Sequence, residues 1–363
     1  MSIIIFIIIL GILIFVHELG HFLIAKKSGI RVDEFAVGFP PRLWSKIKDG
    51  TRYSLNLIPF GGYVKIFGET IDDESADPNR ADSFVNKSRM TQASVLVGGV
   101  VFNVIFAWIL LSISFMSGFP TVVSEGDSTN LENSFVVVGN VFENSPAQIA
   151  GIQSADKIIE IKNQNDMISG NQITISRIQE IISNSTEPVD ITIVRKNSEI
   201  SLSIQPELEI ISNAPAIGIS MQRITNTKLP FFFAVKESYI TTGQMIVDIS
   251  VGLSKLIYDA FTGNGSFDNV AGPVGIVKIV GNAADFGFVY LLGFTAFISI
   301  NLAVLNILPF PALDGGRLVV VLIESIIRRP LKPQIVNVVN LVGFIILILL
   351  MIIITIKDFS RIF

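Results

Sequence analysis

Two histidines that lie four residues apart frame a run whose residue types suit metal-assisted hydrolysis. The run is Val16-His17-Glu18-Leu19-Gly20-His21, and it holds both histidines of the 363-residue sequence. On a helix, residues i and i+4 lie on one face, so both imidazoles can bind one metal ion. Glu18 lies between them in sequence and is placed to take a proton from water. The run therefore predicts a helical metal site with His17 and His21 as ligands and Glu18 as the general base.

The run lies in an apolar stretch, and this argues against a chance match. Residues 2–25 contain a single formally charged side chain, that of Glu18. Imidazoles and a carboxylate within a hydrophobic span are costly and normally mark a function. The alternative is a helix end whose polar side chains reach the membrane interface. Because these side chains are short, we favour the metal site.

A catalytic zinc site needs a third protein ligand and one open position. The sequence has no cysteine and no third histidine, so the remaining ligand is a carboxylate. Asp314 is the best candidate, because it follows an apolar stretch that is broken by Pro309 and Pro311. We expect that stretch to run in the same direction as residues 2–25, which puts Asp314 at the depth of the histidines. The alternative role for Asp314 is the N-cap of the helix that begins just after it.

The elements that position these residues are membrane helices. Half of the residues are hydrophobic, 16% are charged, and the mean hydropathy is +0.60. Ordinary soluble domains are about 25% charged. Each of four apolar stretches is long enough to cross a bilayer, and they cover residues 2–25, 92–117, 287–309 and 334–356. The first has neither the basic start nor the small-residue cleavage site of a signal peptide.

Most of the basic residues that flank the stretches lie on one side and predict their orientation. They follow the first span, precede the second, and lie between the third and fourth. Lys357 and Arg361 after the fourth stretch weakly favour the opposite orientation. Short positive loops are normally cytoplasmic, so both termini and the long segment 120–285 are expected outside the cytoplasm. The formal net charge is −4 and basic residues do not form one stripe, which makes a nucleic-acid partner a poor hypothesis.

The long outer segment contains a soluble α/β module over residues 134–208. β-Branched runs predict strands at 135–138, 157–161, 189–194 and 200–204, the last two joined as a hairpin through residues 196–198. Ser145-Pro146 predicts a helix start, and Ile175, Ile178 and Ile182 predict a second short helix. Residues 229–261 mix aromatic and charged residues, which fits amphipathic helices at the outer surface better than a fifth span.

Taken together and in this order, the motifs resemble the site-2 protease family of intramembrane zinc metalloproteases (peptidase family M50), in particular its bacterial RseP-type members. The motifs are the HELGH run, Asn306 to Gly316, Gly99-x-x-x-Asn103, Phe60 to Val64, and Ala271 to Ile276. The resemblance implies one zinc ion per chain on His17, His21 and Asp314, with Glu18 as the catalytic base. It also implies substrate contacts, at Asn301, Asn306, Gly61, Gly62 and Tyr63.

Two polar residues of these motifs have alternative interpretations. Asn306 either stabilises a developing oxyanion or bonds the carbonyls that are freed where the helix breaks. Asn103, with Gly98 and Gly99, is interpreted as allowing close helix packing rather than as part of catalysis.

The resemblance also assigns roles to two other segments. Residues 53–66 predict a hairpin with a loose glycine corner, and by resemblance it is a membrane re-entrant β-loop whose edge adds the unwound substrate. A plain cytoplasmic hairpin is the alternative. The outer module resembles a PDZ domain, but Ala155 stands where the family usually has glycine, and no glycine-rich carboxylate-binding loop is evident. We therefore expect this module to exclude bulky substrates rather than capture peptides.

The resulting hypothesis is a polytopic α-helical membrane protein with four transmembrane helices, an inserted extracytoplasmic α/β PDZ-like domain and a cytoplasmic-side re-entrant β-hairpin. The expected parts are an N-terminal membrane part (1–119), the PDZ-like domain (120–210), a linker with amphipathic helices (211–285) and a C-terminal membrane part (286–363). The expected function is regulated intramembrane proteolysis, in a bacterial inner membrane. Its substrates are single-span proteins, either anti-sigma-factor-like regulators or remnant signal peptides. A transporter and an inactive scaffold are the rivals; the first needs paired broken helices, and the second would have lost metal ligands.

Overall fold

A computed structural model describes residues 2–69, 77, 79–122, 134–195, 198–211, 214–263 and 271–362. The chain forms two compact units. One consists of Met1–Phe115 together with Pro230–Phe363, and the other is the inserted segment Met116–Leu229.

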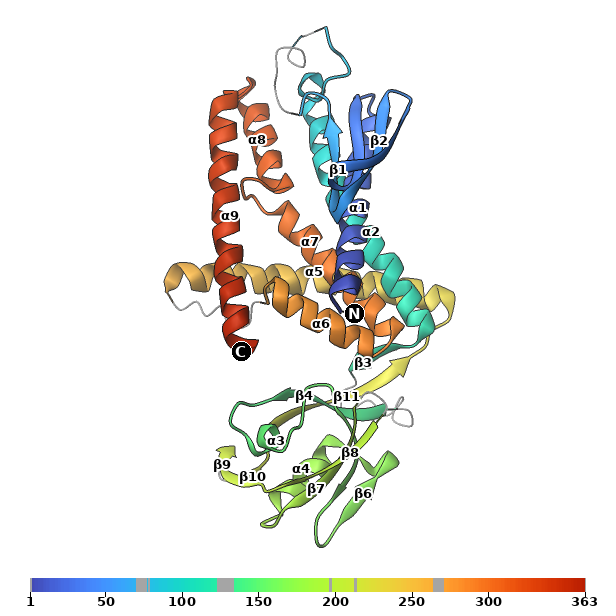
Figure 1. The fold of residues 1–363 in the computed structure, drawn as a ribbon, viewed down its shortest axis with the longest axis vertical. Helices are drawn as coiled ribbons and strands as arrows, with labels where there is room; N and C mark the ends of the chain where they lie inside the picture. The colour runs from blue at the N-terminus through green and yellow to red at the C-terminus, as the bar shows by residue number, and fades with distance from the viewer. Residues whose placement is uncertain are drawn as a thin grey trace. The chain divides into compact units, whose positions relative to one another are not determined.

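Four helices in the described part of the first unit are long and apolar enough to cross a membrane, which confirms the expected number of candidate spans. They are α1 (Ser2–Lys27), α2 (Arg89–Ser117), α7 (Phe288–Ile307) and α9 (Pro333–Ile362). The same unit contains α5 (Phe231–Thr262), α6 (Pro273–Asp285), α8 (Asp314–Ile327) and a 3-10 turn, η1 (Phe84–Asn86). Helix α5 is one continuous helix that lies crosswise to α9 (Figure 1). It is not among the four candidate spans.

Helices α1 and α2 touch backbone to backbone. A Cβ atom added to Gly20 of α1 would lie 2.3 Å from the carbonyl oxygen of Gly98 in α2. Such an approach is open only to glycine. It places the polar face of α1 directly against α2.

The first unit also holds a two-stranded β-hairpin of β1 (Val32–Lys48) and β2 (Thr51–Ile66). Its turn is Asp49-Gly50, with φ values of 50° and 74°. Asp-Gly with both φ values positive is the preferred two-residue turn between antiparallel strands. The expectation that the hairpin turns at the Gly61-Gly62 corner was wrong, because these glycines lie within β2.

The hairpin strands bend back on themselves. Phe35 of β1 pairs with both Tyr53 and Val64 of β2, and Val37 pairs with both Leu55 and Gly62. The first part of β1 therefore lies between two parts of β2, and residues 62–66 form one edge of the resulting small sheet.

The hairpin lies along α1. A Cβ atom on Gly11 would lie 3.4 Å from the carbonyl oxygen of Pro59, and one on Gly61 would lie 2.9 Å from the Cδ1 atom of Ile14. Since α1 begins at Ser2 and ends at Lys27, β2 reaches about the middle of this helix.

The described part of the second unit contains a seven-stranded sheet and the helices α3 and α4. In order across the sheet the strands are β3 (Phe119–Val122), β11 (Ile219–Thr227), β4 (Ser134–Val141), β5 (Lys157–Lys162), β7 (Val189–Arg195) and β8 (Ser198–Ile204), and β6 (Met167–Ser169) also pairs with β5. The remaining elements are α3 (Pro146–Ile149), η3 (Gly170–Gln172), α4 (Ile175–Ser183), β9 (Glu207–Ile211) and β10 (Ala214–Ala216). Isoleucines and valines of the strands and α4 form its core.

The helix cap that the sequence predicts in the second unit forms at the expected residue. The Oγ atom of Ser145 accepts a hydrogen bond from the backbone N–H of Gln148 and caps α3. Strand β11 pairs with β3 and β4, so the sheet extends beyond residue 210, where we expected the module to end. Residues 196 and 197 of the predicted turn lie outside the described residues.

Candidate active site and metal centre

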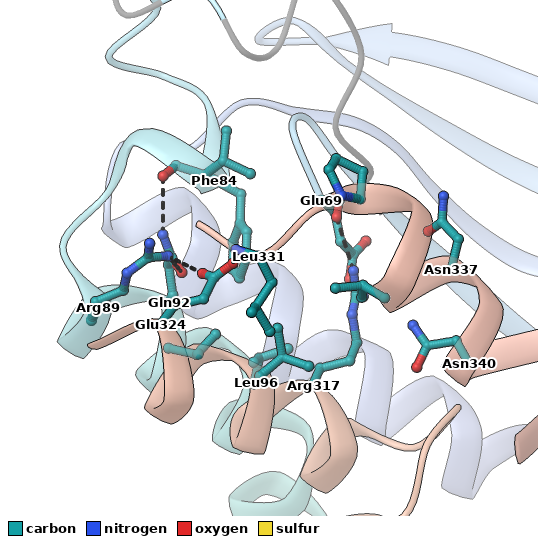
Figure 2. A pocket seen from close by; sticks show the side chains of 15 residues that line it. Glu69, Phe84, Arg89, Gln92, Leu96, Arg317, Glu324, Leu331, Asn337 and Asn340 are labelled. Atoms are coloured by element: carbon teal, nitrogen blue, oxygen red, sulfur yellow. Dashed lines mark hydrogen bonds and ion pairs between the residues drawn. The ribbon is translucent and has the colours of Figure 1, made fainter. Parts of the chain in front are cut away.

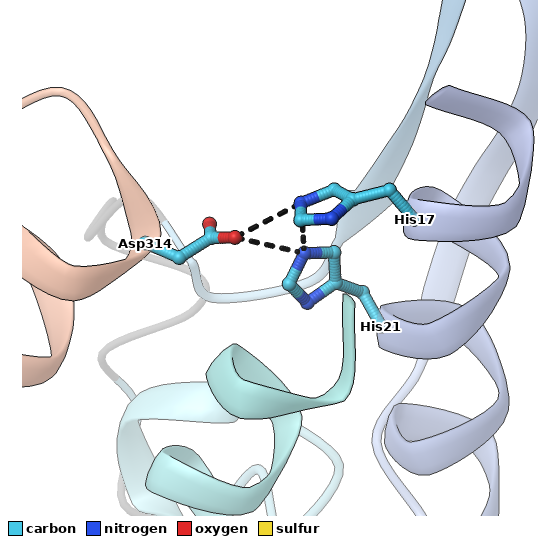
Figure 3. A group of neighbouring side chains, drawn as sticks. All are labelled: His17, His21 and Asp314. Atoms are coloured by element: carbon cyan, nitrogen blue, oxygen red, sulfur yellow. Dashed lines mark hydrogen bonds and ion pairs between the residues drawn. The ribbon is translucent and has the colours of Figure 1, made fainter. Parts of the chain in front are cut away.

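Three side chains from the two ends of the sequence meet beside α1. The Nε2 atoms of His17 and His21 lie 3.0 Å and 3.3 Å from one carboxylate oxygen of Asp314, and 3.2 Å from each other. The histidines project from adjacent turns of α1, and Asp314 reaches them from the start of α8 (Figure 3).

The spacing of these three atoms fits one small cation. Nitrogen and oxygen ligands at 2.0–2.1 Å from a tetrahedral zinc ion lie about 3.3 Å from one another. The three distances among the Nε2 atoms and the carboxylate oxygen, 3.0 Å, 3.2 Å and 3.3 Å, are close to that value. The donor set of two imidazoles and a carboxylate is one that zinc enzymes use.

The hydrogen bonding of His21 supports the same conclusion. Its Nδ1 atom lies 2.8 Å from the carbonyl oxygen of Val95, so Nδ1 carries the proton and donates. In the neutral ring the Nε2 atom is then an acceptor, and it faces the Asp314 oxygen, which is also an acceptor. A cation between the two removes this conflict.

Asp314 is the first residue of α8, and the helix is preceded by Leu313 at the N-cap position. The alternative interpretation of Asp314 as the N-cap is therefore wrong. The backbone before α8 bonds partly within itself, because the N–H groups of Phe310 and Leu313 donate to the carbonyls of Leu308 and Phe310, while Ala312 N–H donates to the side chain of Asn340 in α9. The helix start is packed tightly, since a Cβ on Gly315 would lie 2.1 Å from the oxygen of Leu308.

Gly99 of α2 provides the space that the histidine rings occupy. A Cβ atom at this position would lie 2.5 Å from Nε2 of His21 and 2.6 Å from Cε1 of His17. We interpreted this glycine from the sequence as a helix-packing residue only. Its contact with both imidazoles depends on how α1 and α2 are paired, and no sequence signal reports that pairing.

Glu18 lies beside the three candidate metal ligands. It lines a cavity together with His17 and Asp314. One of its carboxylate oxygens accepts a hydrogen bond, 3.0 Å long, from the backbone N–H of Val64 in β2. The hairpin edge therefore fixes one oxygen of the carboxylate, and the other oxygen makes no hydrogen bond within the described part of the chain.

The predicted substrate-contact residues divide into three groups. Asn306 lines the same cavity as Glu18, whereas Asn301 is not among the residues that line it and donates to the carbonyl of Phe297 in its own helix. Gly61 packs against α1 and Gly62 lies opposite Val37. The ring of Tyr63 stacks on that of Phe39.

A second cavity lies where α2, α8 and α9 begin or end (Figure 2). In it Arg317, one turn after Asp314, pairs with Glu69, which follows β2, and Arg89 pairs with Glu324 at 2.6 Å. The Arg317–Glu69 pair connects the helix that supplies Asp314 to the segment that follows the hairpin edge. Helix α8 is thus tied to the segment that follows β2.

Comparison with known proteins agrees with this geometry. The profile described as Peptidase family M50 matches residues 5–350. The chain belongs to peptidase family M50. It is 36% identical to a Clostridium perfringens relative whose name describes a zinc metalloprotease, over 95% of each chain. It is also 28% identical to Protease RseP of Yersinia pestis, over 98% of each chain.

Membership of this family makes the protein a zinc metalloprotease, as the sequence resemblance predicted. Its candidate membrane spans make it a membrane-embedded one.

Proposed function

We propose that this M50 metalloprotease is an intramembrane endopeptidase that cuts single-span membrane proteins in regulated intramembrane proteolysis. The observation that carries the proposal is the origin of the three proposed zinc ligands. His17 and His21 come from the candidate span α1, and Asp314 lies seven residues after the end of the candidate span α7. Water and substrate would therefore meet at a site enclosed by apolar helices.

Zinc at this site would polarise the scissile carbonyl and make water a better nucleophile at neutral pH. Glu18 would take the proton of the attacking water on its free oxygen and then give it to the leaving amine. Because Val64 already bonds the other oxygen, the carboxylate is held in one orientation for both transfers.

Asn306 is the proposed donor to the developing oxyanion. It lines the catalytic cavity with Glu18 and Asp314. The competing role, bonding the carbonyls freed at the helix break, is less needed because backbone N–H groups bond two of them. An amide that is already oriented toward the cavity can stabilise negative charge at little reorganisation cost.

The β-hairpin is proposed to enter the membrane and to hold substrate. Its contacts with Gly11 and Ile14 are near the middle of α1, a depth at which a cytoplasmic hairpin would not be expected. Large apolar side chains of its outer part are exposed, among them Leu43, Trp44 and Leu57. Residues 62–66 at its edge would add an unwound substrate as a further strand beside Glu18.

The inserted unit, Met116–Leu229, is proposed to lie outside the cytoplasm, as the basic flanks of the spans predict, and to exclude bulky substrates. The proposed substrates are anti-sigma-factor-like regulators already trimmed outside, or remnant signal peptides. The proposed location is a bacterial inner membrane, with both termini outside the cytoplasm.

The decisive experiment co-expresses the protein with candidate single-span proteins and identifies the fragments by mass. Glu18→Gln is expected to lower cleavage by about 10²-fold or more, because the amide cannot accept the proton. It should keep about one zinc per chain, since Glu18 is not a proposed ligand.

Substitution of a proposed ligand should differ from Glu18→Gln in its effect on zinc binding. Asp314→Ala, His17→Ala and His21→Ala should each lose zinc as well as cleavage. Full zinc occupancy in Asp314→Ala would contradict the ligand assignment. Fragments that all begin in soluble segments, with none from within the substrate's span, would contradict the intramembrane assignment.

A further inference from the structure

Asn103 of α2 is buried beside the metal centre and faces one of its histidines. Its side chain is fully buried, and its amide lies 3.3 Å from the Nδ1 atom of His17. Within the described part of the chain, the amide oxygen has no hydrogen-bond partner. The residue therefore contacts His17 through one end of its amide and leaves the other end unpaired.

A buried amide with one unpaired end destabilises a fold. The presence of an asparagine at this position therefore calls for an explanation. Packing alone does not supply one, because a leucine of similar size would fill the same space without an unpaired polar atom. The contact with α7 is made by other atoms, since Ser299 donates to the backbone carbonyl of Asn103 and not to its side chain.

The two ends of an asparagine amide suit different states of His17. When Nε2 binds zinc, the neutral ring carries its proton on Nδ1, and that N–H needs an acceptor. When Nε2 instead carries the proton, Nδ1 becomes an acceptor and the amide NH₂ can donate to it. A rotation that exchanges the oxygen and nitrogen of Asn103 serves both states, and the assignment of these two atoms follows from the hydrogen-bond network.

We propose that Asn103 is a positioning residue whose amide oxygen accepts a hydrogen bond from Nδ1–H of His17 in the zinc-loaded enzyme. Val95 does the same for His21 through its backbone carbonyl. Both ligating histidines would then be held by α2 in the tautomer that turns Nε2 toward the metal. Outer partners of this kind typically contribute about 10–100-fold to metal affinity.

The test measures the dissociation constant for Zn²⁺ by competition with a chelator on the detergent-purified full chain. Asn103→Leu removes the acceptor at nearly constant volume and should weaken zinc binding by about 10–100-fold. Asn103→Asp keeps an acceptor in the same place and should bind zinc within about threefold of the wild type, a difference worth less than 1 kcal/mol. Melting temperatures of all variants are recorded without zinc, to separate affinity from folding.

Ser299→Ala is the matched control, because it alters the same α2–α7 contact and leaves the amide untouched. Its zinc affinity should equal that of the wild type. Wild-type affinity in Asn103→Leu, or an equal loss in Asn103→Asp and Asn103→Leu, would overturn the proposal. If the leucine variant does not fold, Asn103→Ala provides the same comparison with Asn103→Asp.

Discussion

At the residue scale, three glycines shape the candidate metal centre as much as its proposed ligands do. Gly20 and Gly98 let α1 and α2 touch, and Gly99 leaves room for both imidazoles. The carbonyl of Val95 and the amide of Asn103 can reach the histidine rings only because this approach is so close. The sequence Gly99-x-x-x-Asn103 is thus part of the site and not only of the helix packing.

Gly99→Ala is expected to weaken zinc binding and proteolysis together, by about tenfold or more, because the new methyl group overlaps both rings. Gly243→Ala in α5 is the matched control, since a Cβ there meets nothing within 4 Å. This control should bind zinc like the wild type and be slightly more stable, as alanine favours helix. Chelator competition and turnover measure both effects, and unchanged zinc affinity in Gly99→Ala would contradict the assignment.

Some residues of the candidate site can be predicted from the sequence, and others cannot. The spacing of His17 and His21 is visible in the sequence because a helix fixes it, and the choice of Asp314 required only the absence of other ligand types. The hydrogen bond from Val64 to Glu18 and the contacts of Gly99 and Asn103 depend on tertiary pairing. Those could not be predicted from one sequence.

At the element scale, the hairpin is the part that sequence reasoning described least well. The four apolar helices follow from hydropathy alone, whereas the hairpin's turn was assigned to the wrong glycines. A signal was available, because Asp49-Gly50 lies between two runs of strand-forming residues. The double pairing of β1 with two parts of β2 has no local signature.

The base of the hairpin is held by a charged group, which makes its stability depend on pH. Burial raises the pKa of the Glu34 carboxyl, but hydrogen bonds from Ser54 and Arg42 outweigh burial and hold its pKa below the ordinary value. The stability contributed by Glu34 is therefore complete above the unfolded pKa of about 4.3 and is lost as pH falls through the lower folded value.

Trp44 fluorescence in a Trp108→Phe background should report this acid loosening of the hairpin. Glu34→Gln should remove the part of the change that depends on pH, whereas Asp49→Asn at the turn should retain it. The same acid transition in Glu34→Gln and in the parent would show that another group is responsible.

Ala155 has a left-handed backbone, with φ of 73°, which explains why glycine is usual in family sequences at this position. Ala155→Gly should therefore stabilise the inserted unit, by about 1 kcal/mol. Gly151, with φ of 91° and open space around it, offers the reverse test. Gly151→Ala should destabilise the unit by a similar amount. Pulse proteolysis of the full chain in urea measures both, and shifts of the same sign would contradict the explanation.

At the scale of the whole molecule, the inserted unit is compact and its termini belong to one segment, Met116–Leu229. Replacing it with a flexible glycine-serine linker should leave the metal centre intact. If the unit excludes bulky substrates, this variant should cut substrates whose outer domain has not been trimmed, which the wild type leaves uncut. Cleavage of trimmed substrates at the wild-type rate is the control.

A groove in the same unit allows a second test of whether the unit excludes substrates by its bulk. It lies between α4 and the start of β11 and is lined in part by Ile182, Gly218 and Met221. Met221→Trp would fill this groove without removing the unit. If that variant behaves like the deletion, then groove occupancy controls access and exclusion by bulk is wrong.

The separation of the proposed metal ligands along the chain has a consequence for biosynthesis. His17 and Asp314 are 297 residues apart; His17 lies in the candidate span α1, and Asp314 begins α8, seven residues after the candidate span α7. A nascent chain whose first helix is already inserted carries an incomplete, harmless centre until almost all of the polypeptide has left the ribosome. If these residues are the zinc ligands, proteolytic competence requires the segment after α7, and a product that terminates before Asp314 should be inactive.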